Sequence, residues 1–168
     1  MTLDNHLAHI RAAPRDCGVI ELIVRRPQEG ERELLDEAEL DTERGLVGDR
    51  WLQRVPLRMH GQLTLMNVRA IAALAPREQW PLAGDQLFVD FDLSQTSLPG
   101  GTQLALGSAM IEISDVPHTG CAKFTARFGS EATRWVNTPL GRELRLRGVN
   151  ARIIQSGTVR RGDELRRR

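Results

Sequence analysis

Residues 109–121 have the sequence Ala-Met-Ile-Glu-Ile-Ser-Asp-Val-Pro-His-Thr-Gly-Cys. In the first part of this stretch Ile111 and Ile113 alternate with more polar neighbours, the period-two pattern of a strand with one buried face. Residues 117–120 then interrupt the pattern, because proline and glycine break regular pairing. Cys121 follows directly, at a strand end, where side chains project from the scaffold into loops. The stretch therefore predicts a half-buried strand that delivers a cysteine to a loop.

Short apolar runs separated by turn residues continue along the chain. The segment 33–40 is ambiguous between helix and strand, and we favour strand because it lies between turn signals and would pair with 19–24. Gly-Asp pairs fit tight turns. The predicted strands are 19–24, 33–40, 62–66, 87–91, 102–106, 109–116, 147–155 and a short final strand after a turn at 157–163, and the Gly-Asp pairs stand at 48–49, 84–85 and 162–163.

Many short strands with frequent turns, and no β-α-β periodicity, predict a mostly-β fold with a closed or nearly closed barrel. Residues 45–51 are expected to form a glycine-rich loop beside it. A few short peripheral helices complete the prediction, at 4–13, 68–74, 123–128 and 131–136, with Asp4, Asn67 and Ser130 as the N-caps of the first, second and fourth.

The length of 168 residues suits one domain and is too short for two ordinary ones, so we expect residues 1–168 to form a single domain. Apolar residues at 40% and charged residues at 27% exclude an intrinsically disordered chain and a coiled coil. No apolar run approaches the roughly 18 residues that cross a bilayer. The first residues lack the basic-then-apolar order of a secretory signal. A cytoplasmic protein without membrane contact is the expectation.

The charge is nearly balanced, with 23 basic and 22 acidic residues and a net charge of +1. A sequence-independent nucleic-acid binder usually carries a clear positive excess, so no nucleic-acid partner is expected. The only basic cluster comprises Arg160, Arg161 and three arginines within 164–168, which we interpret as a solvated basic tail. Lys123 is the only lysine, so pyridoxal phosphate would have one possible Schiff-base anchor.

Cys121 has three cationic or titratable neighbours, His118, Lys123 and Arg127. Positive charge lowers the pKa of a thiol and favours the thiolate, which can carry a persulfide, bind a metal or act as a nucleophile. A buried cysteine acting as a small hydrophobe is the equally weighted alternative. Cys17 has an acidic neighbour instead, and an inert structural thiol is the favoured interpretation there.

Arg147 and Asn150 open the strand after the second pair of helices, where a guanidinium and an amide could hold a phosphate and the edge of a heterocycle. Surface arginines flanking an asparagine turn are an equal alternative. Arg50, after Gly48-Asp49, suits an anion in the same way. His60 could be a ligand or base, although a lone loop histidine more often forms hydrogen bonds.

Together these segments resemble the MOSC family, named for the C-terminal domain of molybdenum cofactor sulfurase. The resemblance runs from about residue 19 to 163, leaving 1–15 as an N-terminal extension and 164–168 as the basic tail. Each piece is weak alone, and their order is fairly specific. The pieces are residues 45–51, Gly84-Asp85 with 88–93, 104–107 with 111–113, Gly120-Cys121-Ala122-Lys123-Phe124, 147–152 and 157–163.

The resemblance implies a barrel-like core in which Cys121 carries sulfur or ligates molybdenum. It implies that Arg147 and Asn150 hold the pterin phosphate and ring region of the molybdenum cofactor (molybdopterin), with Arg50 in a less defined role. Lys123 and Arg127 join this cofactor-binding set as the cations beside the cysteine. Ala122 departs from the polar surroundings usual in the family.

The chain is similar to small stand-alone bacterial members, because it has no room for the additional N-terminal barrel of the amidoxime-reducing branch. It also lacks the pyridoxal-phosphate domain of the sulfurase, so that cofactor is not expected.

Three functions follow as hypotheses. The first is a molybdenum-cofactor protein with Cys121 as metal ligand, reducing an N-hydroxylated or N-oxide small molecule with electrons from an external donor. The second is a sulfur carrier that holds a persulfide delivered to Cys121 by a cysteine desulfurase. The third is a non-catalytic binder of a phosphorylated small molecule.

Overall fold

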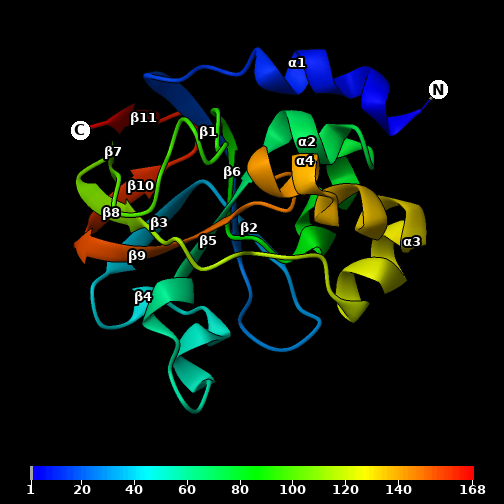
Figure 1. The fold of residues 1–168 in the computed structure, drawn as a ribbon. Coiled ribbons are helices and arrows are strands. Elements are labelled where there is room, and N and C mark those ends of the chain that lie inside the picture. The colour runs from blue at the N-terminus through cyan, green and yellow to red at the C-terminus, as the bar shows by residue number, and fades with distance from the viewer. Residues whose placement is uncertain (1) are drawn as a thin grey trace.

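The computed structural model describes residues 2–168, and within them seven strands close into a barrel (Figure 1). The strand β1 (Cys17–Arg25) pairs on one side with β11 (Glu164–Arg167) and on the other with β6 (Leu87–Asp90). The other four strands complete the ring between β11 and β6 in the order β7 (Gln103–Leu106), β8 (Ala109–Ile113), β9 (Val149–Gln155) and β5 (Leu63–Asn67). The β5–β6 pair is parallel and the others are antiparallel, so the barrel is mixed.

Four more strands extend this barrel. The strand β2 (Glu33–Leu35) pairs with the end of β1, outside the ring. A small second sheet consists of β10 (Gly157–Arg160), β3 (Glu37–Asp41) and β4 (Gly45–Leu46).

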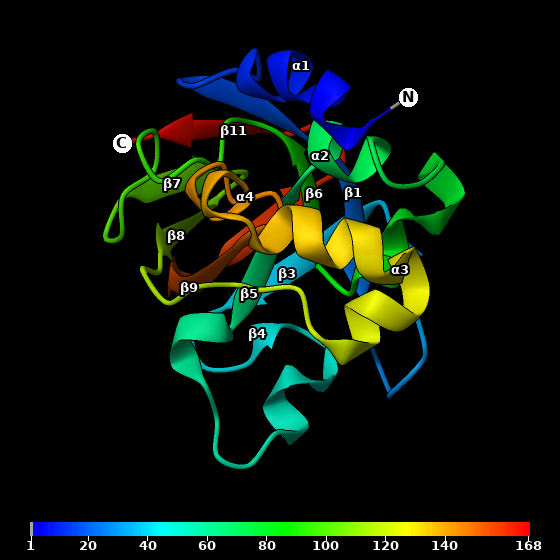
Figure 2. The same cartoon turned by 45° about the vertical axis from the view of Figure 1, so that its right-hand side comes forward.

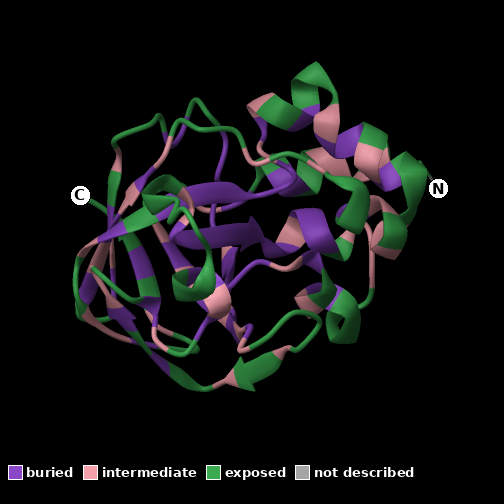
Figure 3. Ribbon diagram, turned by 90° about the horizontal axis from the view of Figure 1, so that it is seen from below, coloured by how far each residue is buried: buried purple, intermediate pink, exposed green. Residues whose placement is uncertain are grey.

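The barrel interior is apolar because alternate residues of each strand point inward. In β6, Leu87 and Val89 belong to the interior cluster, whereas Phe88 packs outward. In β1 a register shift between Ile20 and Leu22 lets Ile20 and Ile23 both reach the interior. Strands β5 and β6 are buried on both faces, since helices cover their outer side, as the burial colours show (Figure 3).

The α-helices gather on one side of the barrel, whereas the 3₁₀ helices between residues 50 and 61 lie apart from them beside β4 (Figure 2). The α-helices are α1 (Leu7–Arg11), α2 (Val68–Ala72), α3 (Ala122–Asn137) and α4 (Pro139–Glu143), with short 3₁₀ helices at Leu3–His6, Arg50–Gln53, Met59–Gly61 and Arg77–Ala83. Apolar residues from α1 to α4, among them Ile10, Phe124 and Trp135, form one cluster of their own. None of the helices in residues 2–168 combines the length and apolar character that crossing a bilayer requires.

The predicted mostly-β barrel with short helices is confirmed. Asn67 caps α2 as expected, its Oδ1 accepting a hydrogen bond from the Arg69 amide. The two helices predicted at 123–128 and 131–136 are the halves of α3, which Gly129 interrupts with a φ of 88°. All three Gly-Asp turns have a glycine at positive φ, namely Gly48, Gly84 and Gly162.

Several local predictions were wrong. Asp4 is not a helix N-cap, because the N-terminal helix starts one residue earlier and the Asp4 carboxylate accepts a hydrogen bond from the indole of Trp135. The segment 33–40 divides between two strands, and only β2 pairs with β1, whereas β3 joins the second sheet.

Three segments predicted as irregular contain regular structure. Strand β4 and the start of a 3₁₀ helix lie within 45–51, and β10 lies within the predicted turn at 157–163. The basic tail 164–168 contains β11, which closes the barrel with Leu165 fully buried. Pairing partners far away in the sequence decide these segments, which is why local patterns missed them.

Candidate functional site

A cavity of about 390 Å³ lies between the start of α3 and the ends of several barrel strands. We call it the cationic cavity, because its lining includes Arg26, Arg32, Arg50, Arg54, Arg58, Lys123, Arg127 and Arg147. Cys121, Asn150, His60 and His118 line it too. Among residues 2–168 no aspartate or glutamate lines this cavity. The six residues predicted from sequence as site residues, Cys121, Arg147, Asn150, Arg50, Lys123 and Arg127, therefore all lie around one hollow.

Cys121 is an exposed free thiol that stands at the N-cap position of α3. Two reciprocal hydrogen bonds hold the residue before it, since the Gly120 amide donates to Asn137 Oδ1 at 3.0 Å and Asn137 Nδ2 donates to the Gly120 carbonyl at 3.1 Å. The Cys121 carbonyl accepts from the amide and hydroxyl of Thr125. The backbone that presents the sulfur is thus fixed at both ends of α3.

The surroundings of Cys121 favour its thiolate. Partial burial raises the pKa of the thiol, but the backbone amides of Phe124 and Lys123 and the positive charge of Arg147 lower it by more. The net result is a pKa below the ordinary value of a cysteine thiol. An exposed thiol with a lowered pKa is the reactive form of the residue, so the interpretation of Cys121 as a buried small hydrophobe is wrong.

Arg26, which lines the cavity, forms a buried ion pair with Asp49, which does not line it. The Asp49 carboxylate accepts hydrogen bonds from Arg26 Nε at 2.9 Å and Arg26 Nη2 at 2.7 Å, and also from the backbone amides of Arg26 and Trp51. The side chain of Asp49 is fully buried. The two backbone bonds fix the carboxylate, and the two side-chain bonds fix the Arg26 guanidinium, whose Nη1 donates to the Gly84 carbonyl at 2.9 Å.

A second buried pair joins Arg147 and Asp85. Arg147 Nη1 donates to Asp85 Oδ2 at 2.6 Å, Nη2 donates to the Ala83 carbonyl at 2.9 Å, and the guanidinium lies 4.9 Å from the ring centre of Phe124. Asp85 Oδ1 faces His118 Nδ1 at 3.5 Å. Within residues 2–168 neither of these two atoms has a hydrogen-bond partner, and Arg147 Nε has none either.

His118 is neutral at physiological pH. Burial lowers its pKa to about 4, with a further contribution from the positive charge of Arg147, while Asp85 opposes the change. The His118 imidazole is therefore a neutral polar group beside the arginines that line the cavity.

The backbone at Gly148 allows this arrangement. Gly148 has a φ of 95°, and a Cβ there would lie 2.4 Å from the Leu65 carbonyl oxygen, so only glycine fits between Arg147 and the start of β9. Two residues on, Asn150 Nδ2 donates to the Val116 carbonyl at 3.2 Å and ties β9 to the loop that leads to Cys121.

Lys123 is exposed and forms an ion pair with Glu29, which lies 4.0 Å from Arg50. The lysine hydrogen bond and charge, followed by the charge of Arg50, lower the pKa of Glu29. Lys123 thus sits at the rim of the cavity with a carboxylate beside it.

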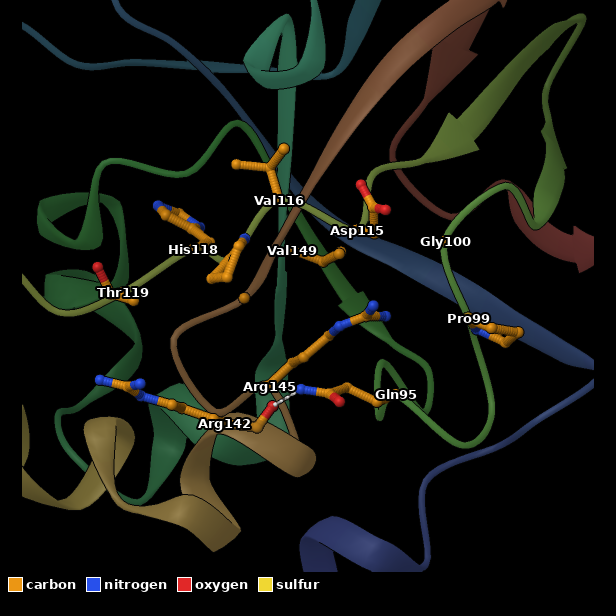
Figure 4. Close-up of a pocket in the computed structure, with 12 residues that line it drawn as sticks. Gln95, Pro99, Gly100, Asp115, Val116, His118, Thr119, Arg142, Arg145 and Val149 are labelled. Atoms are coloured by element: carbon orange, nitrogen blue, oxygen red, sulfur yellow. Dashed lines mark hydrogen bonds between the residues drawn. The ribbon is translucent and has the colours of Figure 1, made fainter.

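A neighbouring cavity of about 430 Å³ shares the wall Val116–Thr119 with the cationic cavity (Figure 4). Its polar groups are partly engaged by the backbone: Gln95 Nε2 donates to the Arg142 carbonyl, and Arg145 Nη1 donates to the Leu93 and Leu98 carbonyls. Cys121 does not line it. The thiol chemistry therefore belongs to the cationic cavity.

Sequence reasoning missed much of this site. Arg26, Arg32, Arg54 and Arg58 were not singled out, and His118 was considered only as a neighbour of the cysteine. The pairs Gly48-Asp49 and Gly84-Asp85 are predicted as turns and as pieces of the family resemblance, but no role is predicted for their aspartates, which are the buried counter-ions of Arg26 and Arg147.

Three solved structures share this fold. YuaD from Bacillus subtilis superposes with a TM-score of 0.66 at 17% identity, covering 89% of this chain and 94% of that one. YiiM from Escherichia coli has a TM-score of 0.59 at 19% identity, covering 89% and 69%. YiiM from Geobacillus stearothermophilus has a TM-score of 0.62 at 12% identity, covering 90% and 75%. At these sequence identities the likeness establishes the fold alone.

No protein-family model and no curated protein sequence matches the chain. The comparisons therefore establish the barrel fold, and the function has to be argued from the cavity.

Proposed function

We propose that this chain is a MOSC-type protein that binds the molybdenum cofactor in the cationic cavity, with the Cys121 thiolate as a ligand of the metal. We propose further that it is a reductase of N-hydroxylated or N-oxide compounds. The observation that carries the proposal is the position of Cys121, an exposed thiol of lowered pKa at a cavity lined by seven arginines. A thiolate is a suitable ligand for molybdenum, and guanidinium groups bind phosphate. The molybdenum cofactor contains both a metal and a phosphate.

The residues present fit the cofactor. Arg50 Nε and Arg147 Nε are buried N–H donors without a partner in residues 2–168, so an anion entering the cavity would find unused donors. Within the same residues there is no cluster of three or more histidine, cysteine, aspartate or glutamate side chains that could hold a metal. A metal here would thus have Cys121 as its protein ligand, and its other ligands would come from the cofactor.

Each side chain has a separate role in this proposal. Arg50 and Arg147 would bind the pterin phosphate, Asn150 would hold the loop against β9, and Lys123 and Arg127 would contribute charge at the rim. Asp85 and Asp49 keep Arg147 and Arg26 in place, which limits the reorganisation that ligand binding requires. When bound, the cofactor supplies two-electron redox chemistry, and an external donor supplies the electrons.

The test is the molybdenum and pterin content of the protein purified from a cofactor-producing host, beside Cys121→Ala and the matched Cys17→Ala. We expect near-stoichiometric metal in wild type and Cys17→Ala, and loss of the metal in Cys121→Ala. Full molybdenum content and full reductase activity in Cys121→Ala would refute the proposal.

The sulfur-carrier hypothesis is the second candidate, and the exposure of Cys121 favours it as well, because a persulfide donor must reach the sulfur. Intact-mass measurement after incubation with a cysteine desulfurase and cysteine would show one added sulfur in wild type and none in Cys121→Ala. An unchanged wild-type mass would refute it. The non-catalytic binder of a phosphorylated molecule remains the third candidate, for which Cys121→Ala would leave phosphate affinity unchanged.

A further inference from the structure

The cationic cavity contains more positive charge than one phosphate needs. Three of its cations have carboxylate partners: Arg26 has Asp49, Arg147 has Asp85 and Lys123 has Glu29. Five guanidinium groups remain, and the nearest carboxylate to any of them is Glu29 at 4.0 Å from Arg50. A phosphate monoester carries about two negative charges at neutral pH, so one such group would leave most of this charge unmatched.

Two of the five guanidinium groups, Arg32 and Arg127, converge on Gly84. A Cβ built on Gly84 would lie 3.7 Å from Arg32 Nη2 and 3.7 Å from Arg127 Nη1. Neighbouring carbonyls hold both side chains, since Arg32 Nε donates to Pro81 O at 3.0 Å and Arg127 Nη1 donates to Leu82 O at 2.7 Å. We call these two residues the Gly84 pair.

The other three, which we call the loop arginines, belong to one segment of chain: Arg50, Arg54 and Arg58. Their guanidinium groups form no hydrogen bond to any residue of 2–168, and Arg50 Nε is buried without a partner. These three guanidinium groups on one short segment are a second set of donors. They differ from the Gly84 pair in their place in the sequence and in having no hydrogen bond to backbone carbonyls.

Arg26 lies between the two sets. Its Nη1 donates to the carbonyl of Gly84, where the pair converges, and its backbone carbonyl accepts a hydrogen bond from the Arg50 amide at 2.8 Å. Positive neighbours act on both sets of arginines. The pKa of Arg32 is lowered mainly by burial and then by the charges of Arg127 and Arg26. The pKa of Arg54 is lowered mainly by burial and then by the charges of Arg26 and Arg50. Bound anions would relieve this repulsion on each side.

We propose that the cavity binds two phosphoryl groups at once, one at the Gly84 pair and one at the loop arginines, with Arg26 between them. This inference rests on the proposed function only for the identity of the group at the loop arginines, which would be the pterin phosphate that Arg50 binds; the group at the Gly84 pair is the second one. The second phosphoryl group belongs either to the same ligand, as a diphosphate, or to a phosphorylated substrate bound beside it.

The experiment titrates the full chain, purified without cofactor, with inorganic phosphate at low salt by isothermal calorimetry and ³¹P NMR. We expect two phosphates per wild-type chain, and one in each of the double variants Arg32→Gln/Arg127→Gln and Arg54→Gln/Arg58→Gln. The control Arg142→Gln, an exposed arginine of the neighbouring cavity, should keep both. One phosphate per wild-type chain, or loss of the same single site in both double variants, would overturn the inference.

Pyrophosphate then separates the two sources of the second group. One pyrophosphate per chain, at least about tenfold tighter than phosphate and displacing two phosphates, identifies a diphosphate ligand. Pyrophosphate no tighter than phosphate, with two phosphate sites intact, identifies two separate molecules. If a double variant fails to fold, as judged by circular dichroism, a single variant of the same set replaces it: Arg58→Gln for the loop arginines and Arg127→Gln for the Gly84 pair. Each single variant should weaken one of the two sites and leave the other unchanged.

Phosphate counting and molybdenum retention are independent measurements. Two phosphate sites in a protein that never retains molybdenum would refute the proposed function alone. A single phosphate site in a protein that does retain it would refute this inference alone.

Discussion

The barrel interior and the cationic cavity differ in whether their side chains find partners within the protein. In the interior, apolar side chains from seven strands, such as Leu65, Leu87 and Ile111, pack without exposure to solvent. In the cavity, burial and cationic neighbours lower the pKa of Arg32 and Arg54. Two buried donors there, Arg50 Nε and Arg147 Nε, have no partner among residues 2–168.

The difference shows which region has hydrogen-bond donors available for a ligand. Buried polar groups in proteins are nearly always hydrogen-bonded, so the unpartnered donors of Arg50 and Arg147 in one hollow are the observation on which the proposed anion site rests. The apolar interior needs no such partner. Changes in the two regions should therefore affect stability and binding in different proportions.

The largest expected effect concerns the buried ion pair between Asp49 and Arg26, a residue that lines the cavity. Asp49→Asn leaves Arg26 buried without its counter-ion, and removing one partner of a buried ion pair costs about 3–5 kcal/mol of unfolding free energy. Urea denaturation measures it. The control Glu37→Gln breaks the exposed pair with Arg160 and should cost less than about 1 kcal/mol. Equal losses of unfolding free energy in the two variants would contradict the distinction between the buried and the exposed ion pair.

The next effect is a dependence of stability on pH that comes from His118. Its pKa is lowered from 6.5 to about 4 in the folded protein, so between these values the unfolded chain binds more protons. The stabilising contribution is present above pH 6.5 and is lost as the pH falls to about 4, a change of about 3 kcal/mol. Urea denaturation at pH 7, 6, 5 and 4 checks it, and His118→Gln should flatten the curve in this window. An unchanged slope in the variant would contradict the assignment.

The two thiols should differ in reactivity, because Cys121 is exposed with a lowered pKa while Cys17 lies partly buried in β1. Cys17→Ser, which keeps Cys121, should react with iodoacetamide at pH 7 at least about tenfold faster than Cys121→Ser. The reaction rate of Cys121 in the Cys17→Ser protein should also remain measurable at lower pH than the rate of Cys17 in Cys121→Ser. Similar rates in the two single-cysteine proteins would show that the surroundings of α3 do not activate the sulfur.

The smallest effect concerns a cavity arginine. Arg54 has cationic neighbours and no hydrogen bond to residues 2–168, so Arg54→Gln should leave the unfolding free energy within about 0.5 kcal/mol or raise it. Phosphate affinity should fall at the same time. The comparison is Arg44→Gln, which removes an exposed arginine paired with Glu39 and Asp41 and should lower the melting temperature slightly. A marked destabilisation by Arg54→Gln would mean that this arginine supports the fold.

Local patterns predicted the elements whose neighbours along the chain decide them. The alternation of 109–113 indicates a strand, and the structure has β8 there with Ile111 and Ile113 buried. The Asn67 cap and the division of α3 at Gly129 follow from equally short-range rules. Residues 157–160 and 164–167 were less predictable, since they become strands only through pairing with β3, β1 and β7.

The sequence by itself determined the barrel and the place of Cys121, because period-two burial and the break at Pro117 are encoded in adjacent residues. The family resemblance predicted Arg50, Arg127 and Arg147 beside Cys121, and only the tertiary structure added Arg26, Arg32, Arg54 and Arg58 to the same cavity. These arginines come from positions between 26 and 147, and closing the barrel brings them together around two buried aspartates. Charge interactions depend on distance in space and not on spacing along the chain, so no local pattern could have shown this grouping.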